Sequence, residues 1–470
     1  MASRRLSLVA LQLTLLLGLW FICLAWGAGG ALAKPGDGVS GAKQRPVEVA
    51  LAPLLAQGGG VTVTSPPVGL SIEYPVMAAD LGAGTCPPPG LPAELLRLGS
   101  PPLELAGASQ DLTAPSGALS GQPSSWETAT LYSLPAAFWT QLHCLLSVAR
   151  DPLTVGLNMR SGNLGWATQI AAGAQSAATN GLTFSLGNEP DLYGLPNYSS
   201  LDKPLPGAEG AEASLYLQLA AYLRPAVGAA PIIGPELSRA DWRAQLPRVI
   251  SQLHPQTVGV HLYPLTTCRT PSEVTLGGLL SSPAADAPAR LAWVVADARA
   301  AGLPAIISEA NSASCGGRAG VSDSPAAAVW AVRFVLSALK TGFGEVRFHF
   351  SGNPYDPFIV SGGQVLARPL ESALVALNQW LPVGASLRTV PGIRELVASV
   401  VRQPSGTGLL ILDNERARAR PVVLHTSRGV RGQLLTATRA APQDESLTPA
   451  HGRIRLTLAA NSVLALSLAQ

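Results

Sequence analysis

Two glutamates, Glu189 and Glu309, each close an apolar stretch of this sequence. Glu189 follows LTFSLGN at 182–188, and Glu309 follows AIIS at 305–308. A carboxylate at the end of a buried strand costs free energy unless it is paired or used by a site. Two carboxylates that meet in one pocket can act as nucleophile and proton shuttle, the arrangement that cleaves glycosidic bonds with retention of configuration. The pair therefore predicts glycosidase chemistry.

The elements that would position these acids form a regular alternation between residue 68 and about residue 379. The predicted strands are 68–73, 95–99, 154–158, 182–188, 232–235, 258–263, 305–308 and 345–350. Between them lie stretches with apolar residues at three- and four-residue spacing, which predict helices at 164–178, 214–227, 291–301, 325–340 and 369–380. Eight strand–helix units over this length predict an α/β fold, a (β/α)8 TIM barrel.

An open, doubly wound sheet would give the same alternation of strands and helices. The first predicted strand, however, is followed by YPVM at 74–77, which cannot serve as a glycine-rich phosphate loop. Polar residues also lie at or near the end of nearly every predicted strand, and in a barrel these ends converge on one mouth. These residues are Glu73, Asn158, Glu189, Glu236, His261, Tyr263, Glu309 and His349.

The pattern of predicted elements changes after residue 382, where β-rich runs follow one another without predicted helices between them. The runs are 396–401, 408–412, 421–425, 433–436, 454–458 and 462–468, and they predict an accessory antiparallel β-sandwich. The runs 47–51 and 61–63, before the barrel, can lend it strands. The predicted organisation is a leader at 1–33, a strand-lending segment at 34–65, the catalytic barrel at 66–382 and the β-sandwich at 383–470.

The leader carries the features of an export signal. Arg4 and Arg5 precede the uncharged stretch 6–33, which ends in Ala31-Leu32-Ala33, a small-x-small cleavage pattern. Its apolar part is about long enough to span a bilayer, so a retained membrane anchor is the alternative. In either case we expect an exported protein that is secreted, periplasmic or anchored facing outward.

The composition restricts the kinds of molecule and cofactor that we expect the protein to bind. With 47% hydrophobic residues, a net charge of +3 and no cluster of lysines and arginines, the sequence argues against nucleic acid as a partner. Beyond the leader, Cys86, Cys144, Cys268 and Cys315 predict two disulfides in one of three pairings. There is no CxxC pair and the histidines are dispersed, so we expect no metal site and no cofactor.

Several segments resemble glycoside hydrolases of clan A. LGNEPDLY at 186–193 resembles the acid/base motif of that clan, and HLYPL at 261–265 resembles its sixth-strand tyrosine segment. SEANSASCGG at 308–317 is similar to the nucleophile segment of glycoside hydrolase family 79, which contains β-glucuronidases and heparanases. VGLSIE at 68–73 and RLGS at 97–100 resemble the first two strands of that family. The resemblance covers roughly residues 47–470.

The resemblance implies roles for individual residues. Glu189 would be the general acid/base and Glu309 the nucleophile. Asn188 would hydrogen-bond the 2-hydroxyl of the sugar, and Tyr263 would orient Glu309. Four more residues at strand ends or in the loops that follow are candidates for substrate contact: His261, His349, Tyr193 and Glu73. The alternatives are a core histidine bonded to the backbone for each histidine, loop packing for Tyr193 and an ion pair with a barrel-top arginine for Glu73.

Cys268 and Cys315 follow the sixth and seventh strands, whose ends are neighbours in a barrel. We therefore predict that they form a disulfide, and the sequence leaves the pairing of Cys86 with Cys144 open. Two turns depart from the family: GSPP at 99–102 stands where a GGNS-like turn is usual, and HFSG at 349–352 lacks the second glycine that commonly follows the histidine.

The resemblance implies a carbohydrate substrate, a β-glucuronide or a related glycoside. Because basic clusters are lacking, an exo-acting β-glucuronidase-like enzyme is favoured over an endo-acting, heparanase-like hydrolase of a sulfated polymer. A non-catalytic carbohydrate-binding surface protein on the same fold is the alternative from another class. It would have one of the two glutamates displaced or unpaired.

Overall fold

The computed structural model of the protein describes residues 45–56, 59–118, 132–193, 209–393 and 395–468. The chain divides into two units, Met1–Gln44 and Arg45–Gln470, and the first of these, with the predicted leader, lies outside the described residues. Within the described ranges, no helix combines the length and the apolar character needed to cross a bilayer.

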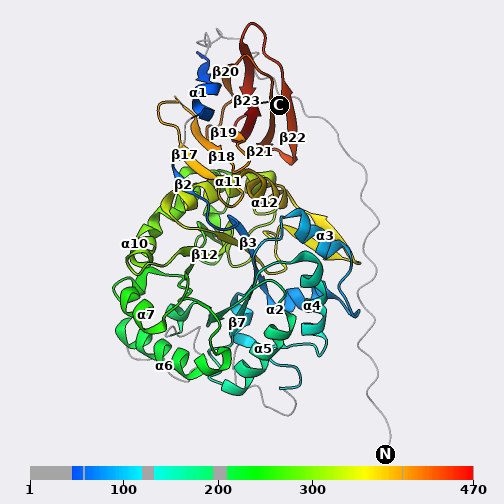
Figure 1. The fold of residues 1–470 in the computed structure, drawn as a ribbon, viewed down its shortest axis with the longest axis vertical. Helices are drawn as coiled ribbons and strands as arrows, with labels where there is room; N and C mark the ends of the chain where they lie inside the picture. Colours follow the sequence, from blue (N-terminus) through cyan, green and yellow to red (C-terminus); the bar gives the residue numbers. More distant parts are fainter. Residues whose placement is uncertain (1–44, 57–58, 119–131, 194–208, 394, 469–470) are drawn as a thin grey trace, which may run out of the picture. The chain divides into compact units, whose positions relative to one another are not determined.

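The centre of the second unit is a parallel eight-stranded sheet ordered β10-β12-β14-β3-β4-β7-β8-β9. Parallel bridges from Ile233 to Thr257 and from Leu237 to Val260 join the last strand to the first, so the sheet closes (Figure 1). This confirms the predicted (β/α)8 barrel. Its strands are β3 (Val68–Glu73), β4 (Leu103–Ala106), β7 (Leu153–Leu157), β8 (Leu182–Leu186), β9 (Ile232–Ile233), β10 (Val258–Leu262), β12 (Ala305–Ala310) and β14 (Val346–Phe350).

The predicted second strand at 95–99 is wrong. These residues belong to helix α3 (Gly90–Arg97) and its C-terminal end, in which Leu91, Leu95 and Leu98 recur at helical spacing and are all buried. The second barrel strand is β4, which begins after Pro101 and Pro102. The GSPP turn therefore does not lie at the C-terminal end of a barrel strand, and the segment that does is AGAS at 106–109.

Helices surround the barrel strands (Figure 1). Those of more than one turn are α2 (Tyr74–Leu81), α3, α4 (Phe138–Ala149), α5 (Leu164–Ala177), α6 (Glu209–Val227), α7 (Leu246–Leu253), α10 (Ala292–Ala300), α11 (Pro325–Thr341) and α12 (Pro369–Trp380). Most of the residues of α11 are buried because the barrel covers one side of this helix and a second sheet covers another.

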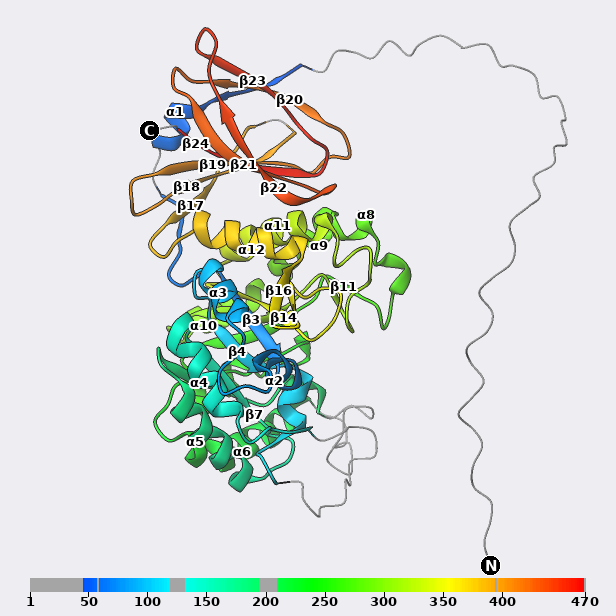
Figure 2. The ribbon, with the colours of Figure 1, turned by 90° about the vertical axis from the view of Figure 1, so that its right-hand side faces the viewer.

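The second sheet belongs to a β-sandwich that packs on α11 and α12 (Figure 2). One layer is ordered β2-β17-β18-β19-β24-β21-β22 and the other β1-β20-β23. In this sandwich, β1 (Val47–Ala50) pairs in parallel with β20, and β2 (Val61–Thr62) pairs with β17. The remaining strands are β17 (Ser386–Thr389), β18 (Val397–Arg402), β19 (Gly408–Asn414), β20 (Arg420–His425), β21 (Val430–Thr436), β22 (Arg439–Leu447), β23 (Arg453–Leu458) and β24 (Ser462–Leu468).

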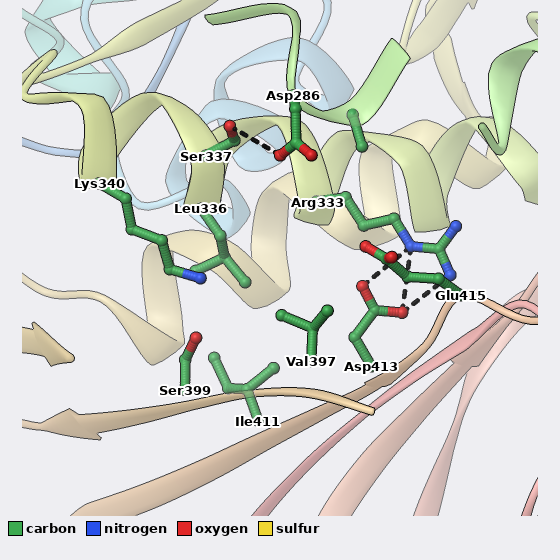
Figure 3. Close-up of a pocket in the computed structure, with 11 residues that line it drawn as sticks. Asp286, Arg333, Leu336, Ser337, Lys340, Val397, Ser399, Ile411, Asp413 and Glu415 are labelled. Atoms are coloured by element: carbon green, nitrogen blue, oxygen red, sulfur yellow. Dashed lines mark hydrogen bonds and ion pairs between the residues drawn. The ribbon is translucent and has the colours of Figure 1, made fainter. Parts of the chain in front are cut away.

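A buried ion pair joins the barrel to the sandwich. The Arg333 guanidinium of α11 donates to both carboxylate oxygens of Asp413 in β19, at 2.8 to 3.1 Å, and also to the carbonyl groups of Asn414 and Leu280. Both side chains are less than 10% exposed. Figure 3 shows the pair at the edge of a small pocket of about 70 Å³, which Lys340 and Asp286 also line. Burial raises the pKa of Asp413 to about 6, although Arg333 opposes the shift.

We expect the substitution Arg333→Met to lower the free energy of unfolding by about 3–5 kcal/mol, because it leaves Asp413 buried without its cation. Chemical denaturation monitored by circular dichroism measures the change. The matched control is Arg239→Met, since Arg239 forms an exposed ion pair with Asp241 and should contribute less than about 1 kcal/mol. Equal losses in the two variants would contradict a special role for the Arg333–Asp413 pair.

Candidate active site

Glu309 lies near the C-terminal end of β12, at the mouth of the barrel. A register shift between β10 and β12 sets it directly beside His261. The hydroxyl of Tyr263 donates to one carboxylate oxygen of Glu309 at 2.7 Å. The other oxygen lies 3.4 Å from Nδ1 of His349 and 3.8 Å from Nδ1 of His261. With 7% of its surface exposed, Glu309 is a buried acid with one hydrogen bond, from Tyr263, and two imidazole rings near its other oxygen.

Glu189 lies two residues beyond Gly187, at the end of β8, and adopts the left-handed conformation with φ 48° and ψ 55°. Nδ1 of His261 is 3.0 Å from one of its carboxylate oxygens. One oxygen of Glu189, one ring nitrogen of His261 and one oxygen of Glu309 all lie within 4.8 Å of one another. The two glutamates, 120 residues apart in the sequence, therefore share one pocket.

A second histidine–carboxylate pair lies beside them. Nε2 of His349, in β14, is 3.4 Å from Oε1 of Glu73, which ends β3. Glu73 also accepts hydrogen bonds from the peptide N–H groups of Ala108 and Ser109, at 3.1 and 2.7 Å. Gly107 is required here, because a Cβ at this position would lie 2.5 Å from Glu73 and 2.6 Å from His349.

The acids hold both histidines in the charged form. Burial alone would lower the pKa of His261, but Glu309 and Glu189 outweigh it and raise the pKa to about 10. Burial would also lower the pKa of His349, but Glu309 and Glu73 outweigh it and raise this pKa to about 9. The pKa of Glu73 lies below its ordinary value, because His349 and Ser109 overcome the effect of burial. At neutral pH the pocket holds two imidazolium cations.

The histidine pKa shifts predict how stability depends on pH. A folded-state pKa above the ordinary 6.5 stabilises the fold fully below pH 6.5, and this contribution is lost as the pH rises through the folded-state value. The acids with pKa values raised to about 6 or 7 also lose stability as the pH rises, but most of that loss occurs below pH 7.5. Between pH 7.5 and 10 we therefore expect the free energy of unfolding to fall.

In His349→Gln the free energy of unfolding should decrease less steeply with pH than in the wild type. The difference in slope should be up to about 1.4 kcal/mol per pH unit, the value for one proton. Urea denaturation at four pH values measures both slopes. The control is His254→Gln, a substitution at the end of α7, outside the mouth of the barrel. Parallel slopes in wild type and His349→Gln would contradict the assignment of a charged His349.

The structure brings together six of the residues that the sequence singled out: Glu189, Glu309, His261, His349, Tyr263 and Glu73. Asn188 is buried next to Glu189, and its peptide N–H donates to Asp111. Tyr193 is also buried, and its hydroxyl donates to Asp111 at 2.7 Å. Tyr193 therefore binds Asp111, the same carboxylate that accepts the peptide N–H of Asn188.

Sequence reasoning missed Asp111, and it noted Tyr355 without distinguishing a substrate contact from loop packing. Asp111 lies in η1 (Ala108–Leu112), within a stretch at 106–133 that has no clear periodicity and of which 119–131 lie outside the described residues. Tyr355 packs against the rings of Tyr263 and His349, with centroids 6.5 and 5.9 Å apart. Its position in the loop after β14 was the available signal, but that position alone did not separate it from ordinary loop residues.

The barrel interior below the site is also polar. Arg347 of β14 donates to Glu104 of β4 at 2.9 Å and to Glu345 at 2.7 Å, and all three are buried. Ser185 of β8 donates a hydrogen bond to Glu236. Branched apolar side chains usually fill this space in a barrel, so here charge pairing replaces part of the hydrophobic packing.

Two disulfides are present, the predicted Cys268–Cys315 and Cys86–Cys144, a pairing that the sequence left open. The first connects the loops that follow Tyr263 and Glu309. Those loops also pair through β11 (Leu265–Thr266) and β13 (Ala313–Ser314). Disulfides are typical of proteins that fold in an oxidising compartment. This one restrains the two segments that carry Tyr263 and Glu309.

No protein-family model and no curated protein sequence matches the chain. Several solved structures, however, match the chain. A 4-O-α-L-rhamnosyl-β-D-glucuronidase from Fusarium oxysporum is 20% identical with a TM-score of 0.65, and the match covers 87% of this chain and 97% of that one. A family 51 α-L-arabinofuranosidase from Bifidobacterium longum is 14% identical with a TM-score of 0.62, covering 91% and 100%. The catalytic domain of GH30 xylanase C from Talaromyces cellulolyticus is 12% identical with a TM-score of 0.54, covering 87% and 98%. At these identities the matches establish a shared fold.

Proposed function

We propose that this chain is an exported, retaining β-glycoside hydrolase of the family 79 type, an exo-acting β-glucuronidase-like enzyme. One observation carries the proposal: an oxygen of Glu189 and an oxygen of Glu309 lie within 4.8 Å of each other at the mouth of the barrel. Retaining enzymes hold their two carboxyl groups about 5–5.5 Å apart, whereas inverting enzymes separate them by about 6.5–9.5 Å. The separation leaves no room for a water between the acids and fits direct attack by one of them.

The contacts in the pocket support different roles for the two acids. Glu73, Glu189 and Glu309 lie beside the two histidines. Glu73 accepts two peptide N–H groups and contacts His349. Glu309 accepts Tyr263 and lies near both histidines. Among the described residues Glu189 has His261 alone. Glu189 therefore has the fewest donors at its carboxylate, which fits the general acid, whereas the more extensive contacts of Glu309 fit the nucleophile.

The reaction then takes two steps. The ionised Glu309 attacks the anomeric carbon while Glu189 gives its proton to the departing oxygen, and a glycosyl ester forms on Glu309. Esterification removes the charge of Glu309. Glu189, now ionised, accepts a proton from water, which attacks the same carbon and releases the sugar with its original configuration.

Two observations support a glucuronide as the substrate. One solved structure that shares the fold is that of a 4-O-α-L-rhamnosyl-β-D-glucuronidase, and the nucleophile segment resembles family 79. The chain has a net charge of only +3, which suits a small glucuronide better than a sulfated polymer. The alternatives are an endo-acting, heparanase-like hydrolase and a carbohydrate-binding protein without activity.

A panel of 4-nitrophenyl β-glycosides tests the proposal, comprising the glucuronide, glucoside, galactoside and xyloside. We expect the glucuronide to be cleaved fastest, and NMR of the first product to show the β anomer. Release of an α anomer would rule out the double displacement. Cleavage of a heparan fragment in its interior would favour the endo alternative, and glycan binding without any cleavage would favour the carbohydrate-binding protein. Glu189, His261 and Glu309 also offer ligand atoms for a cation, so we include EDTA, which should leave the rate unchanged.

A further inference from the structure

Asp111 connects three loops at the mouth of the barrel. It lies in η1, after β4, and is only 1% exposed. One of its oxygens accepts the peptide N–H groups of Met159 and Arg160, at 3.1 and 3.4 Å. The other accepts the peptide N–H of Asn188 at 3.1 Å and the hydroxyl of Tyr193 at 2.7 Å. These four donors belong to the segments that follow β7 and β8.

The contacts of Asp111 lie on either side of Glu189 in the sequence. Asn188 is the preceding residue, and Tyr193 follows four residues later. Between them Glu189 adopts a left-handed conformation, which costs a residue with a side chain about 1–2 kcal/mol and persists only where its surroundings impose it. On the far side, Asp191 accepts the peptide N–H groups of Ser238 and Arg239, at 3.1 and 2.7 Å. The Glu189 turn is therefore anchored to the segments after β4 and after β9.

The carboxylate form of Asp111 is suited to this arrangement because all four of its contacts are donors. An asparagine side chain would keep one acceptor and would turn an NH2 group toward donors. Burial raises the pKa of Asp111 to about 6, since the hydrogen bonds from Tyr193 and the peptide groups offset burial only in part. At neutral pH the group is mainly the acceptor that the four donors require.

We propose that Asp111, acting with Tyr193, is a positioning residue that holds the Asn188–Glu189 turn so that Glu189 can deliver its proton to the departing oxygen. The proposal rests on the proposed function and deepens it. Asp111 acts through the backbone of Asn188 and the Tyr193 hydroxyl, so its loss should affect the proton transfer more than the attack by Glu309.

The leaving group separates these two effects. Phenol needs a proton to depart, whereas 2,4-dinitrophenol is stable as an anion and needs none. In Asp111→Asn we expect kcat/KM on phenyl β-glucuronide to fall by roughly 100-fold, the effect of about 1 Å of misplacement. On 2,4-dinitrophenyl β-glucuronide, kcat/KM should fall by less than about 5-fold, because formation of the glycosyl ester no longer depends on Glu189.

Two further variants separate positioning from loss of stability. Tyr193→Phe removes one donor and should show the same leaving-group split on a smaller scale. Asp356→Asn changes a buried acid that accepts the peptide N–H groups of Ser351 and Asn353 in the loop after β14. If Asp356→Asn lowers kcat/KM, it should lower it by the same factor on phenyl and on 2,4-dinitrophenyl β-glucuronide. An Asp111→Asn enzyme with no loss, or with equal loss on the two glucuronides, would overturn the positioning role and leave the proposed function standing. A wild type that cleaves neither glucuronide would overturn both.

Discussion

Glu309→Gln should lower kcat by roughly 10⁵-fold, which corresponds to about 7 kcal/mol of transition-state stabilisation. The amide keeps the shape of the side chain and its hydrogen bond with Tyr263, but it cannot form the glycosyl ester. The substitution removes the negative charge of Glu309 beside His261 and His349. We therefore expect an anionic sugar to bind at least as tightly as it binds to the wild type. Steady-state kinetics on 4-nitrophenyl β-glucuronide measure the loss, and circular dichroism verifies the fold.

The matched control is Glu273→Gln, which changes an exposed glutamate in the loop after β10 and should retain wild-type activity. A 2-deoxy-2-fluoro-β-glucuronosyl fluoride provides a second readout, because it forms the ester and then reacts slowly. The wild type should gain the mass of one glycosyl group on the tryptic peptide 300–318, and Glu309→Gln should gain none. Label on another peptide would assign the nucleophile elsewhere.

The sequence predicted the barrel because each strand ends where an apolar run meets a polar residue. That pattern located both glutamates, His261 and His349 without any knowledge of their partners. It failed at 95–99, where two turns of an amphipathic helix contain enough leucine to pass for a strand. The true second strand, Leu103–Ala106, contains the fully buried Glu104. Its partner Arg347 lies 243 residues further along the chain, so burial of this acid could not be foreseen.

Distance along the chain also explains why Asp111 was missed. Its donors lie 48 to 82 residues away, and the loop around it has no periodicity to signal burial. In the sandwich, β17 was missed because it is only four residues long. β22 was missed because its sequence RAAPQDESL carries charges and a proline, which are common on edge strands. Local pattern thus gives the elements, whereas the long-range polar contacts require the assembled fold.

Glu189→Ala should separate the two steps of the reaction. On phenyl β-glucuronide, kcat/KM should fall by roughly 10²–10⁴-fold, because no group protonates the departing phenolate. On 2,4-dinitrophenyl β-glucuronide, kcat/KM should stay near the wild-type value, since that leaving group needs no proton. The kcat for the same substrate should fall strongly, because the glycosyl ester waits for a water that no base activates. Comparing the two substrates by steady-state kinetics measures all three effects.

Azide provides the decisive control for this variant. A small anion needs no general base, and removal of the Glu189 carboxylate opens space beside the ester and removes the charge that would repel it. Azide should therefore raise kcat on the dinitrophenyl substrate and yield β-glucuronosyl azide, while wild type and Glu273→Gln should not respond. If azide gave the α-azide instead, Glu189 would be the nucleophile and Glu309 the acid. Their contacts argue against that exchange, because Glu309 accepts the Tyr263 hydroxyl and lies near both histidines, whereas among the described residues Glu189 contacts His261 alone.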